Sequence, residues 1–191
     1  MTPTRGRPRD PHTDELITQA TLDLLRERGP SAVHVDAVAA RSGVARTTIY
    51  RRYSDREALI RAALADFSQA PLPRAELPLK DKLRWELEQV HDLVEEQLGR
   101  GAIAAVLTDA DPTFSKALRG LLVGRLTALQ DEIEADVAAG RLRKGTDAAS
   151  IGTLLFGAYL GELLQHGHPR RGWADPIVDL LLRGLGGKSQ H

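Results

Sequence analysis

One short segment constrains the fold more than any other part of the sequence. Two helices that cross at a steep angle need a small residue where they touch and a residue that tolerates positive φ in the tight turn between them. Ala39 and Gly43 meet these two needs, and three apolar side chains can fill the space between the helices: Val38, Val44 and Ile49. The segment therefore predicts a helix-turn-helix, with helices over residues 35–41 and 46–53.

The rest of the chain also reads as helical. Hydrophobic residues make up 42% of the sequence but aromatic residues only 4%, so the core consists mainly of Leu, Ala and Val, which favours packed helices over sheets. Apolar residues recur with helical spacing between Gly and Pro breaks. We expect an all-α fold of about nine helices, over residues 14–28, 35–41, 46–53, 54–69, 80–98, 102–108, 112–139, 147–166 and 176–185.

Prolines divide the chain into two parts. Pro71, Pro73 and Pro78 interrupt the helical pattern after the fourth predicted helix. We expect residues 1–60 to form a basic N-terminal arm and a three-helix domain with the helix-turn-helix. Residues 61–191 would form a larger helical domain.

Three helix starts carry recognisable cap patterns. Ser54 and Glu57 have the spacing of a capping box. Asp111-Pro112 and Asp175-Pro176 each place a capping carboxylate before a proline suited to the first helical position. We therefore expect helices to begin directly after Ser54, Asp111 and Asp175.

The net charge is zero, with 26 basic and 26 acidic residues, but the charges are unevenly distributed. Residues 1–9 carry three Arg and no acid, and residues 41–61 carry six Arg against two acids. Phosphate binding depends on where charge lies rather than on the total. The N-terminal part of the chain thus suits a nucleic-acid partner.

The second helix of the pair carries side chains that read or grip DNA. Guanidinium and hydroxyl groups reach base edges or phosphates from such a helix. The predicted contacts are Arg46, Thr47, Thr48, Tyr50, Arg51, Arg52, Tyr53 and Arg56. The alternative is a solvated basic face on an ordinary helical bundle.

These residues resemble the TetR family of repressors. The resemblance covers residues 12–60 and is closest through Val38-Ala39, Ser42-Gly43-Val44, Thr48-Ile49-Tyr50, Tyr53 and Arg56-Glu57. It implies a homodimeric transcriptional repressor that binds a palindromic operator and is released by a small, mainly apolar ligand. Family members have Thr or Ser before the second helix and Ser at the start of the third, where this chain has His34 and Ala45. We include His34 among the DNA-binding candidates.

The N-terminal arm resembles an AT-hook core through Arg5-Gly6-Arg7-Pro8-Arg9. Arginine side chains of such an arm can enter the narrow minor groove of A·T-rich DNA. Arg5 and Arg7 are therefore further DNA-binding candidates. The alternative is a basic tail with non-specific affinity, and only groove insertion makes the loss of affinity depend on the flanking A·T content.

The larger domain resembles the ligand-binding and dimerisation half of the family. Its ligand candidates combine aromatic walls with few polar groups: Trp85, His91, Phe114, Leu118, Leu122, Phe156 and Tyr159. Each alone is more often a core residue than a ligand contact. Gly152, Gly157 and Gly161 would let another helix approach closely, so we expect dimerisation through residues 147–166 and 176–185. Internal packing is the alternative.

Other functions find little support in the sequence. The chain has no Cys, no apolar run long enough to cross a bilayer and no apolar core of a signal peptide, so we expect a cytoplasmic protein without a membrane partner. His166-Gly167-His168 lacks a third metal ligand, and we expect no metal and no cofactor. Nucleophile-elbow, Walker and dinucleotide motifs are missing, so we expect no enzyme. The alternatives are a ligand-independent regulator, an activator, or an all-helical enzyme.

Overall fold

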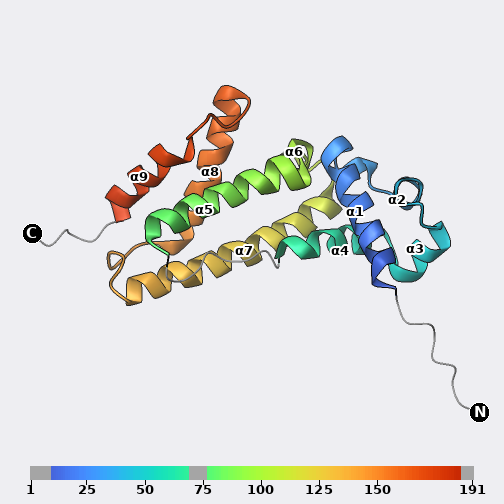
Figure 1. The fold of residues 1–191 in the computed structure, drawn as a ribbon, viewed down its shortest axis with the longest axis horizontal. Coiled ribbons are helices and arrows are strands. Elements are labelled where there is room, and N and C mark those ends of the chain that lie inside the picture. Colours follow the sequence, from blue (N-terminus) through green and yellow to red (C-terminus); the bar gives the residue numbers. More distant parts are fainter. Residues whose placement is uncertain (1–9, 69–76, 186–191) are drawn as a thin grey trace, which may run out of the picture. The chain divides into compact units, whose positions relative to one another are not determined.

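The computed structural model describes residues 10–68 and 77–185, and within these ranges it consists of helices without strands (Figure 1). The all-α prediction is confirmed. The α-helices are α1 (Pro11–Arg28), α2 (Val35–Ser42), α3 (Arg46–Arg52), α4 (Arg56–Ser68), α5 (Leu79–Asp92), α6 (Arg100–Thr108), α7 (Pro112–Ala138), α8 (Ala148–His166) and α9 (Ala174–Leu185). A 3₁₀ turn at Pro30–Ala32 follows α1, and a π-type turn at Leu93–Leu98 follows α5.

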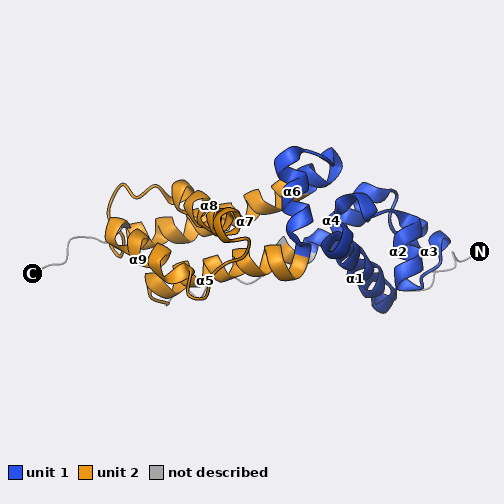
Figure 2. Cartoon of the chain, turned by 90° about the horizontal axis from the view of Figure 1, so that it is seen from above, with its two compact units in different colours: residues 1–66, 98–117 blue, residues 67–97, 118–191 orange. Residues whose placement is uncertain are grey.

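The chain forms two compact units that are each discontinuous in sequence (Figure 2). The first unit comprises residues 1–66 and 98–117, and the second comprises residues 67–97 and 118–191. The helix-turn-helix unit therefore includes α6 and the first residues of α7, which lie about forty residues further along the chain than α4. The functional division at residue 60 stays a prediction.

The first unit is built around the predicted helix-turn-helix. Ile17 and Leu25 of α1, Val38 of α2 and Ile49 of α3 are completely buried. Gly43 ends α2 with φ 71°, in the left-handed region, and its N–H donates to the carbonyl of Ala39 at 3.0 Å. The positive φ that the sequence pattern predicted for this turn is confirmed, and it explains why glycine is favoured there.

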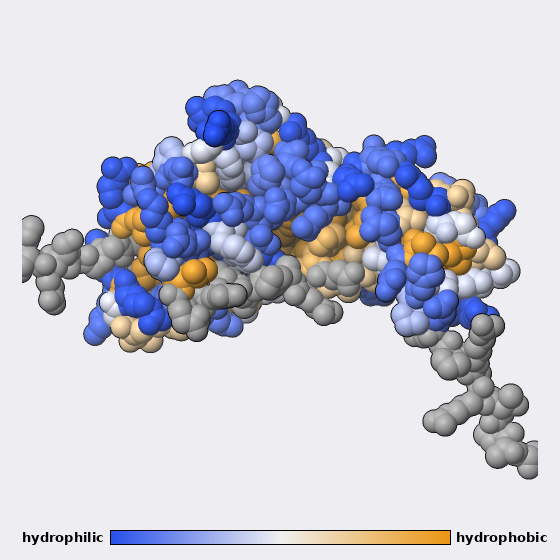
Figure 3. All heavy atoms as spheres, in the orientation of Figure 1, coloured by the Kyte–Doolittle hydropathy of each residue, from blue (hydrophilic) through white to orange (hydrophobic). Residues whose placement is uncertain are grey.

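The second unit has its own apolar core. Leu83 and Leu87 of α5, Ile133 of α7, Ile151 of α8 and Val178 of α9 lie in one buried cluster. Helix α5 packs against both α8 and α9. Hydrophilic residues cover most of the face shown in Figure 3, with hydrophobic residues visible between them in patches. Burying such aliphatic side chains provides the main favourable free energy of folding.

Two of the three predicted helix starts differ in the structure. The Asp111 carboxylate accepts from the Phe114 N–H at 3.0 Å, which confirms the cap of α7. Helix α4, however, is capped by Asp55, which accepts from the Ala58 N–H at 2.7 Å, so the predicted capping box at Ser54 is wrong. Helix α9 begins at Ala174 and already contains Asp175 in its first turn, so Asp175 is not its cap. At α4 the neighbouring Asp55 competes with Ser54 for the cap position, which spacing alone does not resolve.

Gly99 marks a close approach between the start of α6 and the end of α1. Its φ is 79°, and a Cβ atom at this position would lie 2.6 Å from the carbonyl oxygen of Arg26. Backbone atoms cannot move aside as a flexible side chain can. Only glycine fits here without displacing one of the two helices.

We predict that Gly99→Ala destabilises the protein far more than Gly43→Ala. Both positions have positive φ, which costs an alanine about 1–2 kcal/mol, but the Cβ at residue 43 would meet no atom within 4 Å. The clash at residue 99 adds roughly 1–3 kcal/mol. Thermal unfolding followed by circular dichroism should show a fall in Tm of about 2–8 °C for Gly43→Ala and about twice that or more for Gly99→Ala. Equal losses would show that the Gly99–Arg26 approach is not tight in solution.

Candidate DNA-binding surface and ligand cavity

The start of each helix of the pair is organised differently. His34 lies directly before α2, and its Nδ1 accepts from the Ala37 N–H at 3.2 Å. The imidazole therefore caps α2 at the position where the family resemblance implies a Thr or Ser. Ala45 precedes α3 and offers no side-chain cap. His34 thus has a structural role at the start of α2, and it is exposed to solvent there.

Helix α3 presents a polar face to solvent. Tyr50 is 58% exposed, and Thr47 and Arg51 are exposed beside it. Arg46 is exposed as well and forms an ion pair with Asp36 at 2.7 Å. Thr48 is half-buried. An ion pair between two exposed side chains contributes at most about 1 kcal/mol, so Arg46 can exchange Asp36 for a phosphate at little cost.

Two of the predicted contacts turn away from this face and hold α3 against α1. The Arg52 side chain is only 9% exposed, and its Nη1 lies 2.6 Å from Oδ1 of Asp14. Tyr53 donates from its hydroxyl to the same carboxylate oxygen at 3.4 Å, and burial raises the pKa of Tyr53. Both side chains thus take part in packing within the first unit, which residue type alone does not reveal.

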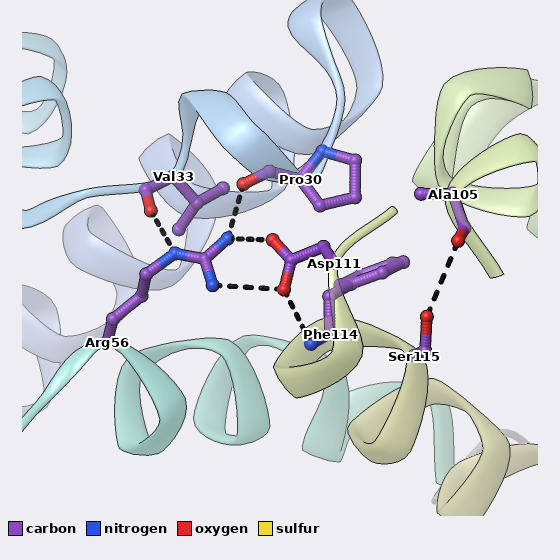
Figure 4. A network of polar contacts seen from close by, with 7 residues as sticks. All are labelled: Pro30, Val33, Arg56, Ala105, Asp111, Phe114 and Ser115. Carbon is purple, nitrogen blue, oxygen red and sulfur yellow. Dashed lines mark hydrogen bonds and ion pairs between the residues drawn. The ribbon is translucent and has the colours of Figure 1, made fainter. Parts of the chain in front are cut away.

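Arg56 is also used internally, at the centre of a network shown in Figure 4. Its Nε donates to the carbonyl of Val33 at 2.6 Å, and its Nη2 donates to the carbonyl of Pro30 at 2.7 Å. Both terminal nitrogens also bind the carboxylate of Asp111, with Nη1 at 3.2 Å from Oδ1. This contact lowers the pKa of Asp111. One guanidinium thus joins the start of α4, the α1–α2 connection and the residue before α7.

The DNA-binding candidates therefore separate into three groups. Arg46, Thr47, Tyr50 and Arg51 share the exposed face of α3, with Thr48 at its edge and His34 at the start of α2. Arg52, Tyr53 and Arg56 make contacts within the first unit, and their binding to DNA stays a prediction. Arg5 and Arg7 lie outside the described residues.

The second unit contains a cavity of about 180 Å³ between helices α5, α7 and α8. Most of its wall is aliphatic or aromatic, as in Leu122 of α7 and Phe156 of α8. The polar groups at the wall include Glu86 of α5 and Arg125 of α7. A largely apolar cavity with a few polar groups is the usual form of a small-molecule site.

Only two of the seven predicted ligand residues, Leu122 and Phe156, line this cavity. Trp85 lies beneath Arg125, whose guanidinium carbon is 5.5 Å from the ring centroid. Phe114 and Leu118 are completely buried core residues in α7.

The remaining two predicted residues form an aromatic cluster in the second unit. Tyr159 is buried, contacts His91 and Trp173 edge to face, and donates from its hydroxyl to Glu95 at 2.7 Å. Tyr159 and His91 are thus placed together, but neither lines the cavity as the structure has it.

Glu86 is the residue that the sequence reasoning missed. It is only 5% exposed, and its Oε1 atom has no hydrogen-bond partner. Burial raises the pKa of Glu86 to about 7, while Arg125 opposes the rise and Glu132 adds to it. The signal was present in the sequence, because Glu86 shares the helical face of Leu83 and Leu87 and so falls where an apolar residue is expected.

Other kinds of site have no support among the described residues. No helix within them is both long enough and apolar enough to cross a membrane. They contain no group of three or more His, Asp or Glu side chains placed to hold a metal ion. His166 and His168 are exposed at the end of α8.

Comparisons with known proteins agree with this organisation. The family of bacterial regulatory proteins named tetR matches residues 17–63, and the tetracyclin repressor-like C-terminal domain matches residues 73–181. The chain is 29% identical over 190 residues to the HTH-type transcriptional regulator YdeS of Bacillus subtilis, covering 95% of this chain and 89% of YdeS.

Solved structures share the fold. A TetR-family transcriptional regulator from Rhodococcus sp. superposes with a TM-score of 0.70 at 19% identity, over 90% of this chain and 97% of that one. A transcriptional regulator from Saccharomonospora viridis, solved in complex with choline, gives a TM-score of 0.69 at 15% identity, over 94% of this chain and all of that one.

The chain thus combines a helix-turn-helix, whose second helix is exposed, with a larger helical unit that contains a cavity. This combination is typical of a helix-turn-helix transcription regulator. With both family models matching in order along the chain, this protein belongs to the TetR family of bacterial DNA-binding transcriptional regulators.

Two adjacent arginines allow a direct test of the division between reading and packing residues. We predict that Arg52→Ala lowers the free energy of unfolding by about 1–3 kcal/mol, because it removes a buried side chain and leaves Asp14 without its partner. Arg51→Ala removes the same side chain from an exposed position and should change stability by less than about 0.5 kcal/mol. Urea unfolding of the two variants measures the difference, and a loss for Arg51→Ala as large as that for Arg52→Ala would contradict the assignment.

Proposed function

We propose that this protein is a homodimeric repressor that binds a palindromic operator through α3 and leaves it when a small, mainly apolar molecule binds the second unit. The observation that carries the proposal is the exposed face of α3 formed by Arg46, Thr47, Tyr50 and Arg51, on a helix whose other side is fixed to the rest of the first unit. A helix held in this way can enter the major groove without losing its shape.

The distribution of ion pairs supports α3 as the helix that contacts DNA. Of the six arginines in residues 41–61, five have an acidic partner within the described part of the chain, and Arg51 has none. An arginine without an acidic partner on the exposed side of a short helix is available to a phosphate. Tyr50 and Thr47 next to it offer hydroxyl groups and an apolar ring for base edges or sugars.

The exposed side of α8 supports dimerisation. Leu154 and Leu164 are 55% and 88% exposed, which is costly for leucine in water unless another surface covers it. A Cβ added at Gly157, which lies between them, would meet nothing within 4 Å. A second copy of the same helix fits this arrangement, because leucines and small residues recur along one strip that a two-fold axis can match with itself. Gly152 differs, since a Cβ there would lie 2.5 Å from the Leu126 side chain, and it serves internal packing.

The ligand part of the proposal rests on the cavity and on the neighbour bound to choline. A cavity in the second unit can affect DNA binding only if the ligand binds the DNA-incompetent conformation more tightly. Helix α7 provides a physical route, since Asp111 directly before it binds Arg56 and the same helix carries Leu122 and Arg125 at the cavity wall.

The operator is found by selecting bound sequences from a random DNA pool at a stated salt concentration. A palindromic site with two half-sites one or more helical turns apart supports the dimeric reader, and enrichment of A·T-rich flanks supports insertion of Arg5 and Arg7. Failure to enrich any sequence would overturn the proposed function.

On the selected operator, we predict that Tyr50→Ala and Arg51→Ala weaken binding about tenfold or more without lowering Tm. Arg51→Ala should also reduce the slope of log K against log salt by about 1 per half-site, because one phosphate contact is lost. Fluorescence anisotropy at three salt concentrations measures both effects. The control is Lys116→Ala, which removes an exposed cation from α7 and should leave affinity and slope unchanged. Wild-type binding by Tyr50→Ala and Arg51→Ala would rule out α3 as the reader.

For the dimer, we predict that Gly157→Arg yields a folded monomer. The new side chain projects into open space in one copy but would collide with a second copy packed on α8. Sedimentation velocity should give the mass of one 20.8 kDa chain for the variant and twice that mass for the wild-type protein. Gly124→Arg is the matched control, because Gly124 is also an open helical position but lies on α7, and it should stay dimeric. A dimeric Gly157→Arg protein would place the interface elsewhere.

A further inference from the structure

The cavity in the second unit is small and its wall is mostly apolar, with Glu86 and Arg125 as the charged residues that line it. Its volume is about 180 Å³. An apolar protein cavity of about 150 Å³ accommodates one benzene molecule. The cavity therefore suits a molecule of one ring with one or two small substituents.

Two of the residues that line the cavity, Glu86 and Arg125, are charged. Glu86 is only 5% exposed, and each side chain has one buried atom without a hydrogen-bond partner within the described structure: Oε1 of Glu86 and Nη2 of Arg125. Buried polar atoms without a partner are rare in folded proteins because they have lost water and gained nothing in return. Both residues line the same cavity, one from α5 and the other from α7, so a single bound molecule can reach both walls.

The charges around these atoms decide the kind of molecule. A cation that approaches Glu86 also meets the guanidinium of Arg125. An anion that approaches Arg125 meets Glu86, with Glu132 close enough to influence the ionisation of Glu86. A neutral group that donates one hydrogen bond and accepts another can bind both the Glu86 carboxylate and the Arg125 guanidinium, and it brings no new charge into a largely apolar cavity.

We propose that the cavity binds a small phenol, whose hydroxyl donates to the carboxylate of Glu86 and accepts from the guanidinium of Arg125 while its ring lies against Leu122 and Phe156. The proposal rests on the proposed function, in that the second unit is the one that senses a ligand, and it names the chemical class of that ligand. It assigns a positioning role for the ligand to Glu86 and Arg125.

The test compares four probes of nearly equal size on the purified full-length protein by isothermal titration calorimetry: 4-methylphenol, 4-methylanisole, 4-methylbenzoate and 4-methylbenzylamine. The phenol donates and accepts, the anisole only accepts, and the other two carry opposite charges. We expect the phenol to bind at least tenfold more tightly than each of the others. Tighter binding of the amine or of the benzoate would overturn the proposal in favour of a site defined by Glu86 alone or by Arg125 alone.

Two variants test whether Glu86 and Arg125 produce the preference for the phenol. Glu86→Gln and Arg125→Met should each weaken phenol binding about tenfold while changing anisole binding by less than threefold. The control is Glu88→Gln, which makes the same change on an exposed position of α5 and should bind the phenol as the wild-type protein does. Unchanged phenol binding in both cavity variants would overturn the proposal. If a variant fails to fold, the four-probe comparison on the wild-type protein still decides it.

Operator binding by the same samples separates this proposal from the proposed function. If none of the four probes binds while the protein still binds its operator, the ligand assignment is wrong and the DNA-binding function stands. If the phenol binds with the expected preference but does not change operator affinity, the chemistry of the site is right and the release mechanism is wrong.

Discussion

The guanidinium of Arg56 holds together the parts of the first unit that must keep a fixed geometry for DNA to be read. It binds the carbonyls of Pro30 and Val33, which lie just before α2, and the carboxylate of Asp111, which caps α7. The Pro30 carbonyl also accepts from the Val33 N–H at 3.0 Å, so Arg56 adds a second donor to it. Lysine would not reproduce these contacts, because its single ammonium nitrogen cannot bind both oxygens of Asp111 through a planar fork while also reaching the two carbonyls. Arg56 therefore adds polar contacts between the start of α4 and the connection before α2 to the apolar core that holds α2 and α3.

The same reasoning changes how the basic segment at residues 41–61 should be read. Its surplus of positive charge suggests broad contact with phosphates, yet five of its six arginines pair with acids of the first unit. Arg52 and Arg56 are in partly buried pairs, Arg46 is in a weak exposed pair, and Arg51 has no acidic partner among the described residues. This arrangement favours specific over non-specific DNA binding, because a surface with fewer unpaired cations has less affinity for nucleic acid of any sequence.

Much of the fold could be predicted from the sequence, and less of the site. Helical spacing, the Gly43 turn and the Ala39–Ile49 frame depend on local geometry, so they predicted the helices to within a few residues. The roles of Arg52 and Arg56 depend on Asp14 and Asp111, which are distant in sequence, and no local pattern reveals such partners. The ligand candidates combine aromatic and apolar residues, and three of the seven, Phe114, Leu118 and Tyr159, belong to the buried core. The cavity is instead distinguished by a carboxyl group at an apolar position, Glu86.

The buried carboxyl of Glu86 also bears on how binding of the proposed ligand could shift the protein between two conformations. A ligand shifts a conformational equilibrium only by the difference between its affinities for the two states. Leaving a buried polar atom without a partner costs about 1–3 kcal/mol, and the coupling between two sites in allosteric proteins is typically about 1–3 kcal/mol. A molecule that binds both Glu86 and Arg125, as the proposed phenol would, gains in the conformation with this cavity a free energy of the size that regulation requires. The proposal thus places the energetic difference between the two conformations in the same two side chains that recognise the ligand.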